Sequence, residues 1–305
     1  MAQTQRLKGL EQQGEGKFQT SVSRRHLLDR LFVGTVFVAT LLGIVVLAIF
    51  LIDVAREGVP RLSWQFLTSF PSQIFPENSG IYPALIGSLW LLGFTALFSV
   101  PLGIGAAVYL EEYAPNNLFT RIIEVNISNL AGVPSIIYGI LGLGIFVNLL
   151  GFATGGPSVL TGALTLTLLI LPVIIVATRE ALRSIPNAVR EGGYALGATR
   201  WEVIRSHLLP MAIPGALTGT ILALSRAIGE TAPLIVVGAS IYLTQLTTSP
   251  FERYMALPYQ IFTWISQPQD EFALLASAGI VVIMVVLLLA NSVAIYLRNK
   301  YQTGA

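Results

Sequence analysis

Six long apolar stretches are the feature that most constrains what this chain can fold into. A helix that crosses a bilayer needs about 20 mostly apolar residues. The sequence is 54% hydrophobic and only 11% charged, whereas about a quarter of the residues in an ordinary soluble domain are charged. We therefore predict an all-helical integral membrane protein. The predicted transmembrane helices are 31–52, 83–110, 127–150, 158–178, 211–239 and 272–297.

The distribution of Lys and Arg predicts which loops face the cytoplasm, because cytoplasmic loops of membrane proteins are enriched in both. With six spans, one face carries fourteen of the 18 Lys and Arg residues and the other carries three, while Arg226 lies inside a span. Both termini are therefore predicted to be cytoplasmic. The positively charged face comprises the tail 1–30, the loops 111–126 and 179–210, and the tail 298–305.

The two longer loops on the opposite face, 53–82 and 240–271, combine prolines with many aromatic residues. Aromatic residues are enriched at the level of the lipid headgroups. We interpret loop 53–82 as an extracytoplasmic amphipathic segment that lies along the membrane, and loop 240–271 in the same way. Their role is either to anchor the chain at the interface or to dock a soluble protein from outside.

The loop 179–210 has the pattern of two short helices separated by a glycine. Pro186 suits a first helical position, and Gly197 suits the left-handed residue that ends a helix. Thr199 with Glu202 three residues later is a capping-box pattern that restarts the helix. Helical spacing predicts two apolar faces. These are Val189, Gly193 and Leu196 on the first helix, and Trp201, Ile204 and Leu208 on the second.

This loop resembles the EAA loop of ABC-transporter permeases. Glu191, two small residues, three spacers, Gly197 and finally Leu209–Pro210 follow the order of that motif. Gly192 and Gly193 stand where the family has Ala-Ala, and His207 stands where Ile is usual. The resemblance implies a coupling helix that seats in a groove of a separate ATPase subunit. The residues assigned to this contact are Val189, Arg190, Glu191, Gly192, Gly193, Leu196, Gly197, Ala198, Thr199 and Trp201.

Two further regions gather polar residues at the ends of predicted spans. Glu111 and Glu112 close the second span on the cytoplasmic side, and we interpret these carboxylates as interfacial. The third span contains Asn126, Ser128 and Asn129, and is too polar to face lipid on all sides. We therefore expect the third span to face the interior of the bundle.

The fifth span contains an opposite-charge pair, Arg226 and Glu230, spaced four residues apart. An arginine deep in a bilayer costs about 2.5–3.5 kcal/mol on insertion scales, so it requires a partner and an interior position. Glu230 lies where it can pair with Arg226 on one helix face. Two interpretations stay open. Either the pair neutralises itself and stabilises helix packing, or Arg226 offers its donors to an anion in transit.

The stretch from Arg226 to Leu234 resembles the signature of the A-type permease subunit of phosphate-specific ABC importers. Supporting resemblances are Ile81–Leu85, Gly87–Leu89, Asn129–Leu143 and Ala256–Ile261. The resemblance implies a type I importer permease (MetI-like) fold in the bacterial cytoplasmic membrane. It also implies a translocation path lined by Arg226, Glu230 and Thr231, and alternating access driven by ATP. The implied partners are a sister permease subunit of C-type, two ATPase subunits and an extracytoplasmic phosphate-binding protein.

The sequence does not predict an enzyme. It lacks a Walker A pattern, so we expect ATP and Mg to be used by the partner ATPase and no cofactor to be bound by this chain. The absence of Cys excludes thiol chemistry, and no catalytic or metal-binding residues are assigned. Three alternatives stay open. They are a permease for molybdate, sulfate or phosphonate, an ion-coupled secondary carrier that uses Arg226 and Glu230, and, with little support, an intramembrane enzyme.

Overall fold

The computed structural model describes residues 22–302, which form helices and connecting loops without a strand. The chain divides into two compact units, residues 1–53 and 54–305. In the described part of the first unit, the backbone belongs to helix α2 (Val22–Gly58), which contains the predicted span 31–52. Its apolar side chains are exposed along that span. A helix that is apolar on all sides is typical of a membrane span.

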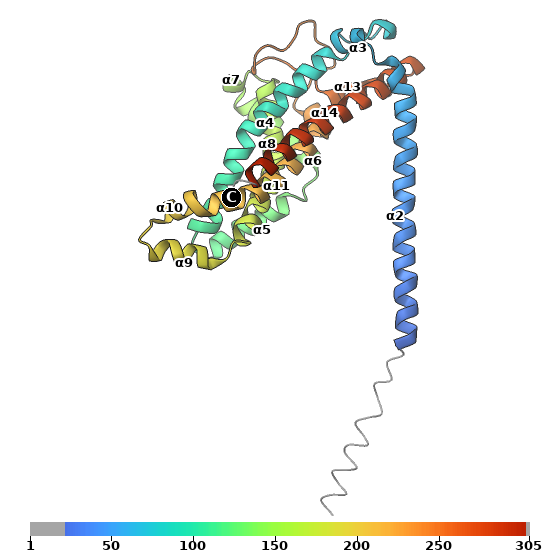
Figure 1. Ribbon diagram of the computed structural model, residues 1–305. Helices are drawn as coiled ribbons and strands as arrows, with labels where there is room; N and C mark the ends of the chain where they lie inside the picture. The colour runs from blue at the N-terminus through green and yellow to red at the C-terminus, as the bar shows by residue number, and fades with distance from the viewer. Residues whose placement is uncertain (1–21, 303–305) are drawn as a thin grey trace, which may run out of the picture. The chain divides into compact units, whose positions relative to one another are not determined.

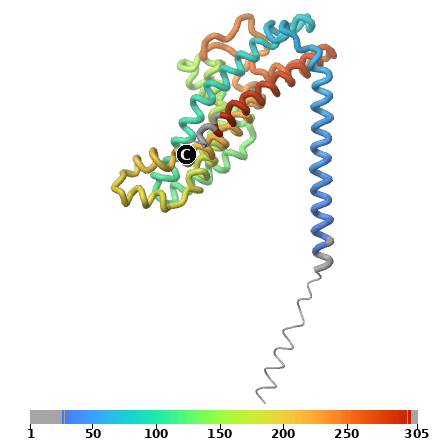
Figure 2. The backbone as a smooth tube through the Cα atoms, in the orientation of Figure 1, coloured from blue at the N-terminus to red at the C-terminus, as the bar shows by residue number. Residues whose placement is uncertain are grey.

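Four long helices form the framework of the second unit (Figures 1 and 2). Helix α8 is the most buried of them and packs against both α4 and α11, while α14 packs against α11. Their bounds are α4 (Tyr82–Val108), α8 (Val159–Arg183), α11 (Leu209–Gly229) and α14 (Asp270–Gln302). Each contains the greater part of one predicted span.

Small residues allow these helices to approach closely. A Cβ atom at Gly103 would lie 2.5 Å from the Ile174 side chain, which places α4 directly against α8. Three residues further along α8, a Cβ at Gly219 of α11 would lie 2.1 Å from Ala177 Cβ. Helix association in lipid depends on such close packing, because lipid is as apolar as the helix surfaces.

The third predicted span is not a single helix. Helix α5 (Leu118–Leu130) and helix α6 (Ser135–Gly142), which a π-helical segment continues to Leu149, are bent by 108° at the break. Pro134 explains the break, because proline lacks an N–H and disfavours a helical residue before it. The predicted span 127–150 therefore consists of parts of two helices that meet at a bend.

The fifth predicted span also differs from its expected course. Helix α10 (Arg200–Val203) continues through the π-helical turn η5 (Ile204–Leu208) into α11, which ends at Gly229. Glu230 then adopts an extended conformation, and the short helix α12 (Ala232–Val236) follows. Pro233 suits the first turn of a new helix, where an N–H has no partner, and not the interior of a long one.

Shorter elements occupy the ends of the second unit. Helix α3 lies at one end and α9 and α10 lie at the other (Figure 1). The aromatic loops contribute to the core through Phe66 and Trp264, whose rings lie 6.0 Å apart, while Trp64 and Phe75 are exposed. The remaining elements are η1 (Val59–Arg61), α3 (Trp64–Thr68), η2 (Pro76–Asn78), η3 (Tyr109–Tyr113), α7 (Gly151–Thr154), α9 (Asn187–Ala195) and α13 (Leu257–Ile265).

Within residues 22–302, five helices are long and apolar enough to cross a membrane, and the bent α5–α6 pair makes a sixth if it counts as one span. This agrees with the predicted all-helical fold, and with the predicted six spans if the bent pair is one of them.

Candidate functional site

The loop between α8 and α11 has the predicted arrangement of helix, glycine and helix. Gly197 has φ 81°, a conformation that favours glycine, and it ends the segment that contains α9. Thr199 and Glu202 form the predicted capping box, in which each side chain accepts a hydrogen bond from the other residue's backbone N–H. Both signals are confirmed. Helix α9 begins one residue after Pro186, at Asn187.

The two short helices pack through a glycine. Gly193 is buried against Val203, and a Cβ at Gly193 would lie 2.7 Å from Val203 Cγ2. Gly192 faces open space, so nothing in the structure requires glycine there. Ile204 and Leu208, which share the predicted apolar face, are fully buried, whereas His207 is exposed and leaves this packing unaffected.

Leu196 and Trp201, each predicted on an apolar face, are exposed in this chain. Leu196 is 90% exposed because it follows the last residue of α9, where the chain turns toward Gly197. Trp201 is also exposed, although it precedes the buried Ile204 by only three residues. Together with the exposed Tyr194, these side chains form what we call the apolar coupling surface (Tyr194, Leu196 and Trp201).

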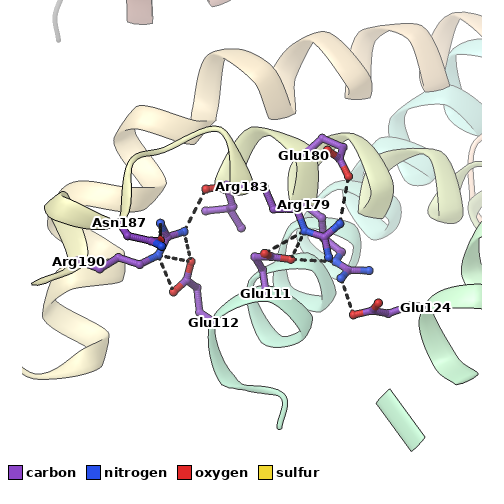
Figure 3. A network of polar contacts seen from close by, with 9 residues as sticks. Glu111, Glu112, Glu124, Arg179, Glu180, Arg183, Asn187 and Arg190 are labelled. Atoms are coloured by element: carbon purple, nitrogen blue, oxygen red, sulfur yellow. Dashed lines mark hydrogen bonds and ion pairs between the residues drawn. The ribbon is translucent and has the colours of Figure 1, made fainter. Parts of the chain in front are cut away.

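Arg190 points inward and contacts three segments of the chain (Figure 3). Its Nη2 donates to Glu112 Oε1 at 2.7 Å and to the Leu182 carbonyl oxygen at 3.0 Å. Its Nη1 donates to the Ile185 carbonyl oxygen at 3.0 Å. The hydrogen bond to Glu112 raises the pKa of the Arg190 guanidinium above its usual value although burial opposes this. Arg190 was expected at the ATPase contact, but its charged group is held inside the chain.

The neighbouring carboxylate, Glu111, turns to helix α8. Arg183 Nε donates to Glu111 Oε2 at 2.9 Å, and Arg179 Nε donates to the same oxygen at 3.3 Å. Arg179 also pairs with Glu124 of α5 and is nearly buried. Glu111 and Glu112, interpreted from the sequence as interfacial, have ion-pair partners that were not predicted. They lie at the centre of the polar network in Figure 3, which joins α4, α5, α8 and α9.

Sequence reasoning missed this network because its partners are far apart in the chain. Glu112 and Arg190 are separated by 78 residues, and Glu111 and Arg179 by 68. The signal in the sequence that could have indicated this network was the number of opposite charges at the ends of two predicted spans. Two adjacent carboxylates end one span, and several arginines follow another on the same predicted face.

The second candidate site is the pair predicted in the fifth span. Arg226 Nε donates to Glu230 Oε1 at 3.2 Å, which confirms the pairing. The Arg226 side chain is 43% exposed in this chain, and Glu230 lies just beyond the end of α11. Thr231, the third residue predicted to line the path, precedes α12 and is partly buried.

The two helix breaks lie next to each other. Gly139 of α6 meets Pro233 of α12, and a Cβ at Gly139 would lie 2.8 Å from Pro233 Cα. Tyr138 packs in one cluster with Ala223 and Ala227 of α11, one turn or less from Arg226. Its hydroxyl donates to the Leu130 carbonyl oxygen at 2.8 Å, across the α5–α6 break. Irregular backbone at membrane depth requires such satisfaction within the protein.

Comparisons with known proteins identify the family. Residues 99–302 match the family described as "Binding-protein-dependent transport system inner membrane component". The chain belongs to this family. It is therefore the permease component of an ABC importer. This component is the non-catalytic membrane subunit, and not the subunit that hydrolyses ATP.

Two relatives and one solved structure illustrate the likeness. The chain is 43% identical over 179 residues to the "Probable ABC transporter permease protein YqgI" of Bacillus subtilis. The aligned residues cover 59% of this chain and 60% of that protein. It is 34% identical over 270 residues to the "Phosphate transport system permease protein PstA 1" of Mycobacterium tuberculosis H37Rv, covering 88% of this chain and 85% of that protein. The fold is similar to that in a crystal structure of a bacterial ABC transporter involved in import of the acidic polysaccharide alginate. The TM-score is 0.61 at 19% identity, over 90% of this chain and 96% of that one.

Proposed function

We propose that this permease component carries inorganic phosphate through the bacterial cytoplasmic membrane into the cell. The observation that carries the proposal is the Arg226–Glu230 pair at the break between α11 and α12, where one hydrogen bond holds a guanidinium that is 43% exposed. A relative that is 34% identical over 88% of this chain is named a phosphate transport system permease protein, which supports the same cargo.

The chemistry of the pair suits an oxyanion in transit. A guanidinium has five N–H donors in a planar fork that matches phosphate oxygens. Glu230 engages only Nε of Arg226, so the terminal nitrogens can donate to a passing anion. The nearby carboxylate lowers the attraction of the site for anions. Conduction requires this, because a site that binds too tightly does not release its ion.

Thr231 extends this path by one polar residue. It lies directly after Glu230 and precedes α12, beside the place where the α5–α6 and α11–α12 breaks meet. A hydroxyl both donates and accepts hydrogen bonds, so it can follow either protonation state of phosphate. The proposed path residues are therefore Arg226, Glu230 and Thr231.

The apolar coupling surface is proposed to dock on a separate ATPase subunit that uses ATP and Mg. Its exposed Tyr, Leu and Trp side chains are of the kind that anchor protein interfaces. Val189, Glu191, Gly192, Gly193, Ala198 and Thr199 would shape or border this contact, and Gly197 fixes the turn that presents it. Closure of the ATPase subunits would then move α9 and α10 and switch the core between inward and outward access.

The remaining proposed features concern orientation and assembly. Most Lys and Arg residues of the loops lie on the face that contains α9 and α10, which supports a cytoplasmic location of both termini and of the coupling surface. A sister permease of C-type would complete the path, and an extracytoplasmic phosphate-binding protein would deliver the cargo to the opposite face.

Uptake of labelled phosphate tests the proposal. The chain is expressed with its matching partner subunits in cells that lack their own A-type permease, and unlabelled arsenate, sulfate, molybdate and a phosphonate compete in parallel. We expect phosphate uptake that arsenate inhibits. Gly197→Trp should abolish it, because the substitution forces a bulky side chain onto a residue with φ 81°.

Other outcomes identify the alternatives. Competition mainly by sulfate, molybdate or phosphonate would retain the importer and change its cargo. Uptake that persists after ATP is depleted would contradict ATP coupling and favour an ion-coupled carrier.

A further inference from the structure

The end of helix α4 carries two adjacent carboxylates that serve different parts of the molecule. Both lie in the π-helical turn η3, where Glu111 is directed to α8 and Glu112 is directed to α9 (Figure 3). Segments of π-helix occur frequently at functional sites. The two side chains therefore connect the transmembrane helices on one side with the coupling helix on the other.

Arg190 of α9 is fixed from several directions at once. Both oxygens of Glu112 accept hydrogen bonds from it, and the carbonyl oxygens of Leu182 and Ile185 accept two more. The last carbonyl groups of a helix have no partner within the helix. Arg190 therefore satisfies the C-terminal end of α8 and holds the end of α4 in the same contact.

Burial of both side chains makes the Glu112–Arg190 ion pair costly to break. Glu112 is 5% exposed and the Arg190 side chain is 16% exposed. A charge left unpaired in such an environment is unfavourable, because it loses both water and its partner. Any displacement of α9 must therefore carry Arg190, Glu112 and the ends of α4 and α8 with it.

We propose that Glu112 is a positioning residue that transmits the movement of α9 to helices α4 and α8 through Arg190. The inference rests on the proposed function, in which an ATPase moves the coupling helices. It adds the route by which that movement enters the transmembrane core. Glu112 touches neither cargo nor ATPase, and it acts only through Arg190.

The contacts predict a specific order among variants. Glu112→Gln leaves the Arg190 guanidinium with its carbonyl contacts but without a countercharge. Arg190→Gln removes both sets of contacts and should have the larger effect. The double variant E112Q/R190Q contains no unpaired buried charge, so its defect should be smaller than the sum of the two single defects.

The experiment measures cargo transported per ATP hydrolysed by the complete transporter in proteoliposomes. This ratio is independent of the amount of protein assembled. We expect Glu112→Gln to lower the ratio by about 5–150-fold, the range of typical coupling free energies. ATP hydrolysis should continue, because the ATPase subunits can close without moving the core. Glu180→Gln is the matched control, since Glu180 is 65% exposed, pairs only with Arg183 and does not contact Arg190.

Each outcome decides the proposal. A lowered ratio in both single variants, with an unchanged ratio in Glu180→Gln, supports it. An unchanged ratio in Glu112→Gln overturns it, including the case in which transport and hydrolysis fall together because less complex assembles. The ratio is measured with whichever anion the wild-type transporter carries, so a failure of phosphate as cargo is separate from a failure of this inference.

Discussion

Two Arg–Glu arrangements in this chain differ in how completely the arginine is held. At the end of α4, Arg190 has hydrogen bonds to a buried carboxylate and to two carbonyl oxygens. At the α11–α12 break, Arg226 has a single hydrogen bond within the described residues, to Glu230, and its side chain is 43% exposed. The amino acids are the same, but only the second arginine has donors that remain available to another molecule.

The difference indicates distinct roles for the two arrangements. A guanidinium whose donors are satisfied and buried fixes the segments that it contacts. A guanidinium held by one bond at the junction of two broken helices can exchange its remaining donors with a passing oxyanion. The predictions below test this division between a closed network and an open pair.

The largest effect is expected from Arg226→Gln at the open pair. Phosphate uptake should fall by at least about 100-fold, the scale seen when one preorganised donor to an oxyanion is removed. The amount of protein in the membrane should stay unchanged, because Glu230 lies beyond the end of α11 and its side chain is 16% exposed. Uptake assays and membrane immunoblots measure the two quantities. A fall in protein that matches the fall in uptake would assign Arg226 to packing.

The closed network should respond to Arg179→Gln through stability. This change leaves Glu111 and Glu124 without their shared partner. Breaking a buried ion pair costs about 3–5 kcal/mol, and the cost here should lie at or below that range because Glu124 is partly exposed. The thermal midpoint of the detergent-solubilised complex should fall. An unchanged midpoint would mean that the network does not hold α5 to α8.

Glu230→Gln should have a moderate effect of a different kind. Removal of the countercharge strengthens the attraction of Arg226 for anions, so the concentration of phosphate at half-maximal uptake should fall while the maximal rate also falls. We expect each change to be on the order of tenfold, which corresponds to about 1.4 kcal/mol. Initial rates of uptake over a range of phosphate concentrations separate the two. A higher half-maximal concentration would contradict the assigned role of Glu230.

The smallest effect is expected from Glu180→Gln at the edge of the closed network. Its contact with Arg183 is exposed and spans only one helical turn, at 3.3 Å. Exposed ion pairs of this kind contribute about 0–1 kcal/mol. Stability and uptake should both remain close to those of the unmodified chain. A loss comparable with that of Arg179→Gln would extend the essential network to the surface.

Local signals in the sequence predicted several features correctly. Gly197, the Thr199–Glu202 capping box and the Arg226–Glu230 pair all depend on residues within four positions of each other. The long apolar stretches likewise indicated membrane helices, because length and composition determine whether a helix can cross a bilayer. These features do not depend on how distant segments meet.

Features that depend on distant contacts were not predicted. The partners of Glu111 and Glu112 lie on segments that only the folded helix bundle brings together. The helical period grouped Leu196 with Gly193 and Trp201 with Ile204, but of these four only Gly193 and Ile204 are buried within the chain. Pro134 and Pro233 lie at the two helix breaks, but these prolines do not by themselves specify the 108° bend between α5 and α6.

The most direct test of the account is phosphate accumulation in proteoliposomes that contain the complete transporter, its binding protein outside and ATP inside. The account predicts that the unmodified complex accumulates phosphate only when ATP is present. It also predicts that the Arg226→Gln complex hydrolyses ATP without accumulating phosphate. Accumulation at the unmodified rate by Arg226→Gln, or accumulation without ATP, would contradict it.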